Sequence, residues 1–412
     1  MTRTFIMAGQ RGASDLGFSP ARLDRLVGVL ESEIERQRLP GAVALIARHG
    51  KLVLCESLGS QDPKAGTPMA LDSIFRIYSM TKPIVSVAAM MLLEQGRLLL
   101  SDPVSKYVPE FARLTVAVGE GGEARAAARA PTVHDLLRHT AGLTYGFMGD
   151  SPLQRRYRES FAGARQMSNE HFCKRLAELP LAAEAGTTWE YSHATDVLGR
   201  VVEVASNQPL SEHLAQHIFE PLGMHETGFF VPPEQHHRIT EAFEHNPDGG
   251  ARMPMLDPRE VPTHESGGGG LMSTALDYAR FLQFMLNRGS LGDLRLLGSR
   301  TVDLMTADHL GTIPVNGASA SPDLLPAGNG FGLGFAVRTA PGLAPVMGSV
   351  GSYYWGGIGG TTFFVDPKED MFALMMIQAP NQRDYYRPLF RNLVYAALVA
   401  APNQRRRKGD IS

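Results

Sequence analysis

The chain contains only two cysteines in 412 residues, Cys55 and Cys173. They lie far apart, in segments with strand and helix patterns, and form neither a CxxC pair nor a zinc-binding pattern, so we expect buried, reduced thiols. No apolar run approaches the roughly 20 residues that a transmembrane helix needs. The first ten residues lack an apolar stretch followed by a small-residue cleavage site. These absences predict a cytoplasmic protein that does not bind a membrane.

The chain also lacks a dominant charge. Its 40 Lys and Arg residues face 42 Asp and Glu residues, which gives a formal net charge of -2 at pH 7. This balance provides no overall attraction to nucleic acid, to an anionic membrane or to acidic substrates. The one basic cluster, at residues 405–408, lies in a polar tail and is expected to be solvated. We therefore predict no nucleic-acid partner.

Several common site motifs are missing as well. There is no GxSxG elbow, which argues against an α/β-hydrolase. The four glycines at 267–270 are not followed by a P-loop lysine. His134 and His139 are five residues apart, off the spacing of a helical zinc pair. We therefore expect no metal and no organic cofactor.

Strand patterns occur near both ends of the chain. They cover residues 42–48 and 52–57 around a short turn at 49–51, and later residues 332–337, 361–365 and 371–377. Amphipathic helices are predicted at 20–38 and at about 385–400. Because isolated hairpins are marginally stable, strands from the two ends are expected to join in one antiparallel sheet.

The middle of the chain has a different character. Helical patterns at 133–139, 169–179, 194–205 and 210–219 are separated by Gly/Pro loops, and no convincing strand pair is found there. We predict an α/β (α+β) fold in which helices flank a central antiparallel sheet and a mainly helical subdomain is inserted. One domain would span 20–400, with its α/β part at about 20–82 and 275–400, its helical part at about 83–274, and tails at 1–19 and 401–412.

A serine and a lysine lie one helical turn apart in the sequence Ser79-Met80-Thr81-Lys82. Positions i and i+3 share a helix face, and a serine needs a base within hydrogen-bond reach to become a nucleophile. The apolar run 84–95, closed by Gly96, predicts a helix, and a proline at 83 belongs in its first turn. Ser79 is therefore expected near the positive end of the helix dipole.

Two further segments can supply partners for this pair. Tyr191 precedes a helical pattern, and its phenol can share a proton with a nearby ammonium group. The segment 353–360 contains Trp355 followed by Gly356 and Gly357. Glycines just before a strand allow close approach of a ligand to the backbone, which suits an N–H donor of an oxyanion hole. Ser192 and His193 are interpreted as ordinary residues of a helix start.

In the order SxxK, YSx and WGG, these elements resemble the family VIII carboxylesterases, which belong to the β-lactamase-like, penicillin-binding superfamily. The resemblance covers about residues 20–400. It implies that Ser79 is the acyl-accepting nucleophile, that Lys82 takes its proton, and that Tyr191 shares this role and returns the proton to the leaving alkoxide. It further implies an oxyanion hole from the N–H groups of Ser79 and Ile358, in a site between the α/β and helical parts.

The same resemblance bears on the substrate. Class C β-lactamases and many penicillin-binding relatives have YxN and KTG motifs, whereas this chain has His193 and Trp355 at the corresponding positions. An apolar wall made by Trp355, Gly356 and Gly357 favours neutral esters over penicillins. We predict a serine carboxylesterase for small to medium acyl esters, with transesterification if another alcohol replaces water. A β-lactamase or D-Ala-D-Ala-type peptidase and, more remotely, a non-catalytic binding protein are the alternatives.

Overall fold

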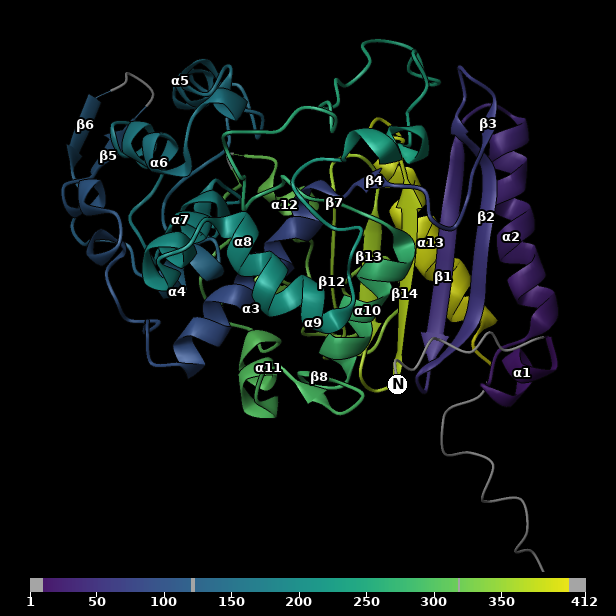
Figure 1. The fold of residues 1–412 in the computed structure, drawn as a ribbon. Helices are drawn as coiled ribbons and strands as arrows, with labels where there is room; N and C mark the ends of the chain where they lie inside the picture. Colours follow the sequence, from purple (N-terminus) through teal and green to yellow (C-terminus); the bar gives the residue numbers. More distant parts are fainter. Residues whose placement is uncertain (1–9, 120–122, 318, 400–412) are drawn as a thin grey trace, which may run out of the picture.

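The computed structural model describes residues 10–119, 123–317 and 319–399, and its central element is an eight-stranded antiparallel sheet (Figure 1). The strand order is β10-β11-β12-β13-β14-β1-β2-β3. In chain order the strands are β1 (Gly41–Arg48), β2 (Lys51–Asp62), β3 (Thr67–Pro68), β10 (Asn329–Phe331), β11 (Ala336–Arg338), β12 (Tyr353–Gly356), β13 (Thr362–Asp366) and β14 (Met371–Ile377). Strands from both chain ends therefore form one sheet, as predicted.

The sheet is buried on both faces. All eight residues of β1 are buried, and alternate side chains enter two separate cores. Ala42, Ala44 and Ile46 face helices α2 (Pro20–Glu35) and α13 (Arg383–Ala397), which pack against each other. Val43, Leu45 and Ala47 face the larger core, which contains α3 (Thr81–Glu94) and α10 (Ala275–Leu286). This two-sided burial explains the nearly continuous apolar sequence of β1.

Most of the remaining helices gather beside the sheet, to the left in Figure 1. They are α4 (Val133–Leu137), α5 (Pro152–Ser160), α6 (Asn169–Ala177), α7 (Ala194–Ser206), α8 (Leu210–Leu214) and α9 (Glu220–Leu222), with α11 (Ser299–Met305) and α12 (Ser321–Leu324) later in the chain. Helix α1 (Gln10–Asp15) lies on the opposite side, against α2 and β2. Of all pairs of described helices, α3 and α7 share the most extensive contact. Because α3 also packs in the core beneath the sheet, the segment that begins with Ser79 joins the helical region to the sheet.

Two expectations about strands were wrong. The middle of the chain does contain a strand pair, β5 (Thr115–Val118) with β6 (Glu123–Ala126), whose second strand is exposed and so has no alternating pattern. The strand expected at 332–337 is broken by Gly334, which has a φ of 96° and separates β10 from β11. The glycine segment 353–360 lies just before a strand, β13, as expected, and its first residues form β12, in which Tyr353 and Trp355 pair with β13.

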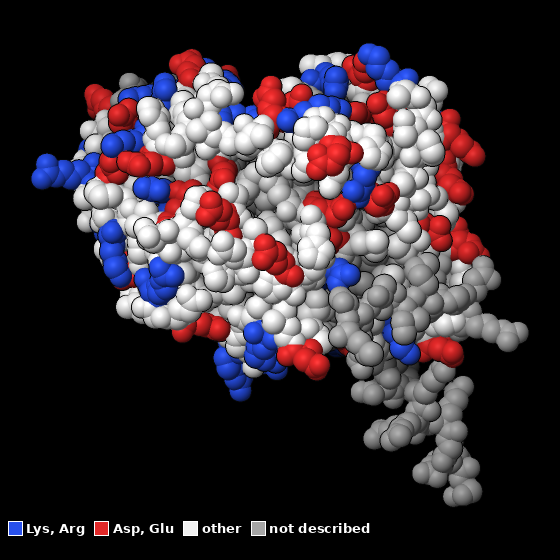
Figure 2. Space-filling view, viewed as in Figure 1, with Lys and Arg blue, Asp and Glu red and all other residues white. Residues whose placement is uncertain are grey.

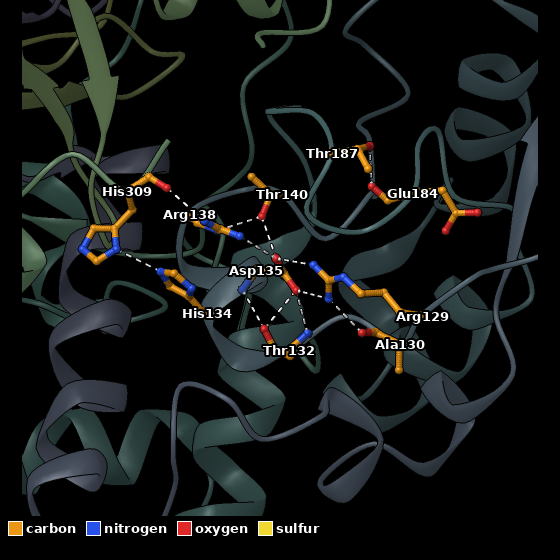
Figure 3. A network of polar contacts seen from close by, with 10 residues as sticks. All are labelled: Arg129, Ala130, Thr132, His134, Asp135, Arg138, Thr140, Glu184, Thr187 and His309. Atoms are coloured by element: carbon orange, nitrogen blue, oxygen red, sulfur yellow. Dashed lines mark hydrogen bonds and ion pairs between the residues drawn. The ribbon is translucent and has the colours of Figure 1, made fainter. Parts of the chain in front are cut away.

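The start of α4 is fixed by the network in Figure 3, which is centred on the buried carboxylate of Asp135. Arg129 Nη1 and Arg138 Nη2 donate to this carboxylate at 2.7 and 3.2 Å, and the N–H of Thr132 completes a capping box. Burial would raise the pKa of Asp135, but these hydrogen bonds lower it. The segment after α4 is thereby anchored, and the carbonyl of His139 accepts from the N–H of Glu190, the residue before Tyr191.

Acidic and basic side chains are interspersed over the face of the molecule in Figure 2. Among the residues that the structure describes, no helix combines the length and apolarity required to cross a bilayer. Cys55 and Cys173 are free and buried, as predicted.

We expect the free energy of unfolding to decrease as the pH falls from about 6.5 to about 4, partly because of His213. This side chain on α8 is 2% exposed, and its Nε2 has no hydrogen-bond partner in the described ranges. Burial, with the charges of His217 and Arg97, lowers the pKa of His213 from 6.5 to about 4. The unfolded chain therefore binds the proton first, which costs up to about 3 kcal/mol of stability.

Urea unfolding at a series of pH values checks this expectation, with His213→Gln as the comparison. The free energy of unfolding of the variant should depend less steeply on pH than that of the parent protein. Some pH dependence will remain because burial also lowers the pKa of His134 to about 4. If the free energy of unfolding of His213→Gln depended on pH as steeply as that of the parent protein, His213 would not contribute to the pH dependence.

Candidate active site

Ser79 lies in a short 3₁₀ turn, Tyr78–Met80, directly before α3. Two short strands hold this turn, because β4 (Phe75–Arg76) pairs with β7 (Met272–Ser273) and brings the four-glycine loop alongside. Tyr78 has a φ of 45°, a left-handed conformation that is unusual for a bulky residue. Such local strain often occurs beside functional residues, and here it turns the chain into α3 next to Ser79.

Helix α3 has the predicted termini. Pro83 occupies the third position of the first turn, where a missing N–H costs nothing. At the other end Gly96 has a φ of 69°, its N–H donates to the carbonyl of Leu93, and the next N–H donates to Leu92. This is a Schellman ending. Lys82, on the second helical position, is only 1% exposed.

The structure brings together the three side chains that the sequence predicts as catalytic. Tyr191 Oη donates to Ser79 Oγ at 2.6 Å, and Lys82 Nζ donates to the same oxygen at 3.2 Å. Lys82 Nζ also lies 4.6 Å from the centre of the Tyr191 ring. Ser79 Oγ therefore has two groups within proton-transfer distance, from segments more than 100 residues apart in the chain.

Contacts of its own backbone and of the preceding residue hold Tyr191 in place. Its N–H donates to Ser321 Oγ at 3.2 Å. The preceding residue, Glu190, is buried and accepts hydrogen bonds from Thr144 and Asn316 at 2.6 Å each. These contacts fix the backbone just before α7, so the phenol position does not depend on the helix alone.

Lys82 has two further acceptors that the sequence analysis missed. Its Nζ donates to the carbonyl of Gly268 at 2.5 Å and to Tyr145 Oη at 3.1 Å. Burial and the charge of Asp196 raise the pKa of Tyr145 well above its ordinary value, so this phenol stays protonated. Tyr145 lies in an irregular segment after α4, where no periodic pattern marks a site residue.

Asp196 on α7 fixes the four-glycine loop that faces Lys82. Its Oδ1 accepts from the N–H of Gly268 at 2.9 Å and from Ser266 Oγ at 2.6 Å, and His193 Nδ1 lies 2.8 Å from Oδ2. Burial would raise the pKa of Asp196, but hydrogen bonds from His193 and His264 hold it well below its usual range. A Cβ at Gly268 would lie 2.8 Å from this carboxylate, which explains a glycine there.

Trp355 on β12 contacts Tyr191 directly. It is 5% exposed, its Nε1 donates to Tyr191 Oη at 3.4 Å, and its ring lies edge-on to Phe331 with centroids 5.3 Å apart. The side chain therefore packs among aromatic rings beside the phenol. This position is compatible with the apolar wall that the sequence analysis predicts.

The segment after β12 lies on the backbone that precedes Ser79. A Cβ at Gly357 would be 2.3 Å from the carbonyl oxygen of Ile77, and one at Gly359 would be 3.0 Å from the Tyr78 ring. The N–H groups of Ser79 and Ile358 donate no hydrogen bond to any residue in 10–119, 123–317 or 319–399. This lack of an internal acceptor is compatible with the oxyanion hole that the sequence analysis predicts.

Gly357→Ala is expected to lower the kcat/KM of any reaction at Ser79 by about 10-fold or more and to destabilise the fold by about 1–3 kcal/mol, because its methyl group collides with backbone. Steady-state kinetics and thermal unfolding measure both effects. Gly28→Ala on α2 is the matched control, since a Cβ there meets nothing within 4 Å. Equal activities of the two variants would show that activity does not require the close approach of Gly357 to the Ile77 carbonyl.

The fold and the Ser-Lys-Tyr cluster define the class of SxxK serine hydrolases. A family model described as Beta-lactamase matches residues 24–397, and the chain belongs to this family. Esterase EstB of Burkholderia gladioli is 33% identical over 370 residues, which cover 85% of this chain and 89% of EstB. An uncharacterized protein of Mycobacterium tuberculosis is 35% identical over 348 residues, or 82% of this chain and 86% of that protein.

A solved structure supports the same grouping. The structure described as "EstCE1, a hydrolase with promiscuous acyltransferase activity" superimposes on this chain with a TM-score of 0.77. The two sequences are 28% identical, and the match covers 91% of this chain and 98% of EstCE1. The comparisons confirm the predicted β-lactamase/transpeptidase-like fold and the resemblance to family VIII esterases.

Proposed function

We propose that this chain is a serine carboxylesterase that hydrolyses small to medium acyl esters through an acyl-enzyme on Ser79. The observation that supports this most directly is the position of Ser79 Oγ, within hydrogen-bond reach of both Tyr191 Oη and Lys82 Nζ. The similarity to esterase EstB and to EstCE1 supports the same reaction class.

In the proposed reaction Ser79 Oγ attacks the ester carbonyl carbon, and its proton moves to Tyr191 Oη or Lys82 Nζ. Either group can accept that proton only while it is itself deprotonated. The N–H groups of Ser79 and Ile358 would bind the carbonyl oxygen as it becomes negative. The bond from the carbonyl carbon to the alcohol oxygen then breaks, and the alkoxide receives the serine proton through Tyr191 Oη. Water then attacks the acyl carbon and gives a proton to the same pair of groups. The bond from the acyl carbon to Ser79 Oγ breaks, Oγ takes that proton, and the acid is released.

The surroundings of Ser79 suggest the kind of ester. Trp355 stands where many penicillin-active relatives have a lysine, and it presents an indole ring beside Tyr191. An apolar wall favours a neutral acyl group over a carboxylate-bearing lactam. A small alcohol that reaches the acyl-enzyme in place of water would give transesterification, as the acyltransferase activity in the description of EstCE1 suggests.

A series of p-nitrophenyl esters with increasing acyl length, run beside a chromogenic β-lactam, tests the proposal. We expect turnover of the short and medium esters and weak turnover of the lactam. Addition of methanol should divert part of the acyl group into methyl ester, measured by chromatography. Efficient lactam hydrolysis with negligible ester turnover would instead identify a β-lactamase.

We also propose that the protein acts in the cytoplasm, without a nucleic-acid or membrane partner. Both cysteines are unpaired, and burial raises the pKa of Cys55 to about 11, so this group stays a thiol. Charges of both signs are mixed on the surface face of Figure 2. Cell fractionation with an antibody tests the location, and recovery in the membrane or secreted fraction would contradict it.

A further inference from the structure

The peptide group between Gly357 and Ile358 has functional contacts at both ends. Its N–H, on Ile358, is the second donor of the proposed oxyanion hole. Its carbonyl, on Gly357, accepts a hydrogen bond from Arg387 Nη2. The two ends of one peptide group thus connect the reacting oxygen of a substrate to a guanidinium group on another element.

Arg387 comes from α13, far along the chain from Ser79, and is half-buried against the end of β12. A Cβ at Gly356 would lie 2.9 Å from Arg387 Nε and 3.0 Å from Cζ, so only a glycine leaves room for the guanidinium. Burial lowers the pKa of Arg387 to about 10, which still leaves the group charged at neutral pH.

The charge of Arg387 is not neutralised by a close carboxylate. Among the described residues no ion pair within 4.0 Å involves Arg387, and its buried Nε has no hydrogen-bond partner. Asp384, one turn earlier on α13, pairs with Arg383 at 3.6 Å and acts on Arg387 only through its more distant charge. A half-buried cation without a close carboxylate is a candidate for a functional role, because partial burial weakens its hydration.

We propose that Arg387 is a positioning residue that strengthens the oxyanion hole through the Gly357–Ile358 peptide group. A charged donor on the carbonyl polarises the peptide bond and makes the Ile358 N–H a better donor, because hydrogen bonds in a chain reinforce each other. The same contact holds Gly357 against Ile77, beside Ser79. This inference depends on the proposed function, because it requires an oxyanion to form at Ile358.

If Arg387 strengthens the oxyanion hole, its stabilising effect should increase as negative charge develops on the substrate oxygen. The ground-state ester oxygen has little negative charge, whereas the tetrahedral oxyanion has nearly a full charge. Loss of Arg387 should therefore lower kcat and leave KM nearly unchanged. A purely structural role would instead lower thermal stability or raise KM.

The experiment compares the full-length enzyme with Arg387→Met, Arg387→Lys and Arg383→Met. Arg383 is the matched control, because it is a cation on the same helix that donates to Pro380 at 2.6 Å and does not contact Gly357. We expect kcat of Arg387→Met to fall about 10-fold, within the effect of deleting one oxyanion donor. Arg387→Lys should be intermediate, and Arg383→Met should remain within about 2-fold of the parent enzyme.

Affinity for a trifluoromethyl ketone, which forms an oxyanion adduct with the serine, provides a second measurement. It should weaken in Arg387→Met by about the same factor as kcat. Unchanged kcat and ketone affinity, or an equal loss in Arg383→Met, would overturn the proposal. If Arg387→Met does not fold, Arg387→Lys tests the proposal in its place. The proposal would be overturned if kcat and ketone affinity of Arg387→Lys equalled those of the parent enzyme. In each case the parent enzyme's ester turnover tests the proposed function separately.

Discussion

Ser79→Ala is expected to lower ester hydrolysis by at least about 10⁴-fold, because no acyl-enzyme can form without Oγ. The substitution removes one oxygen and leaves both hydrogen-bonding partners, Tyr191 Oη and Lys82 Nζ, in place. Substrate binding should therefore change little. Steady-state kinetics measures the loss of turnover, and a fluorophosphonate probe should label the parent enzyme but not the variant.

Ser86→Ala is the matched control for this experiment. Ser86 lies two turns further along α3, is 1% exposed, and its Oγ has no hydrogen-bond partner within the described ranges. This variant should keep its activity and its labelling. Residual labelling of Ser79→Ala would place the nucleophile elsewhere, and equal losses in both variants would point to a disturbed helix.

Removing the Tyr191 hydroxyl is expected to have the second largest effect. Tyr191→Phe should lower the acylation rate by about 100-fold or more, because the Tyr191 hydroxyl, 2.6 Å from Ser79 Oγ, is the nearest group that can exchange a proton with it. Lys82→Ala should cause a loss of similar size. Pre-steady-state release of p-nitrophenol measures acylation separately from deacylation.

Tyr353→Phe controls for the loss of a buried phenol oxygen. Tyr353 lies on β12, two residues before Trp355, and its hydroxyl has no partner among the described residues. Its removal should not reduce activity or stability. Near-normal acylation in Tyr191→Phe would exclude this phenol from the proton route, and the same outcome in Lys82→Ala would exclude the ammonium group.

The sequence was sufficient to predict the contact between Ser79 and Lys82, which depends on local spacing. Ser79 and Lys82 face each other because i and i+3 share a helix face, and the start of α3 is marked by Pro83. The sequence also predicted that strands from the two ends of the chain share one sheet, because each strand needs a partner for its backbone hydrogen bonds. The division at about residues 82 and 275 remains a prediction.

Contacts between distant, irregular segments could not be predicted in the same way. Tyr145 lies in a loop, and Asp196 looks like any polar residue in the first turn of a helix. Arg387 has the sequence context of an exposed helical arginine, yet its guanidinium lies against Gly356. Each contact depends on the path of the chain in three dimensions, and no periodicity or spacing records that path.

The position of β1 in the sheet also affects how the chain can fold. Val43 pairs with Ser57 on one side and with Met376 on the other, so the second pairing must wait until nearly the whole chain has been synthesised. Until then the apolar β1–β2 hairpin has an open edge, which can pair with another chain. We infer that nascent chains of this protein are aggregation-prone until β14 docks, and that late truncations remove solubility together with activity.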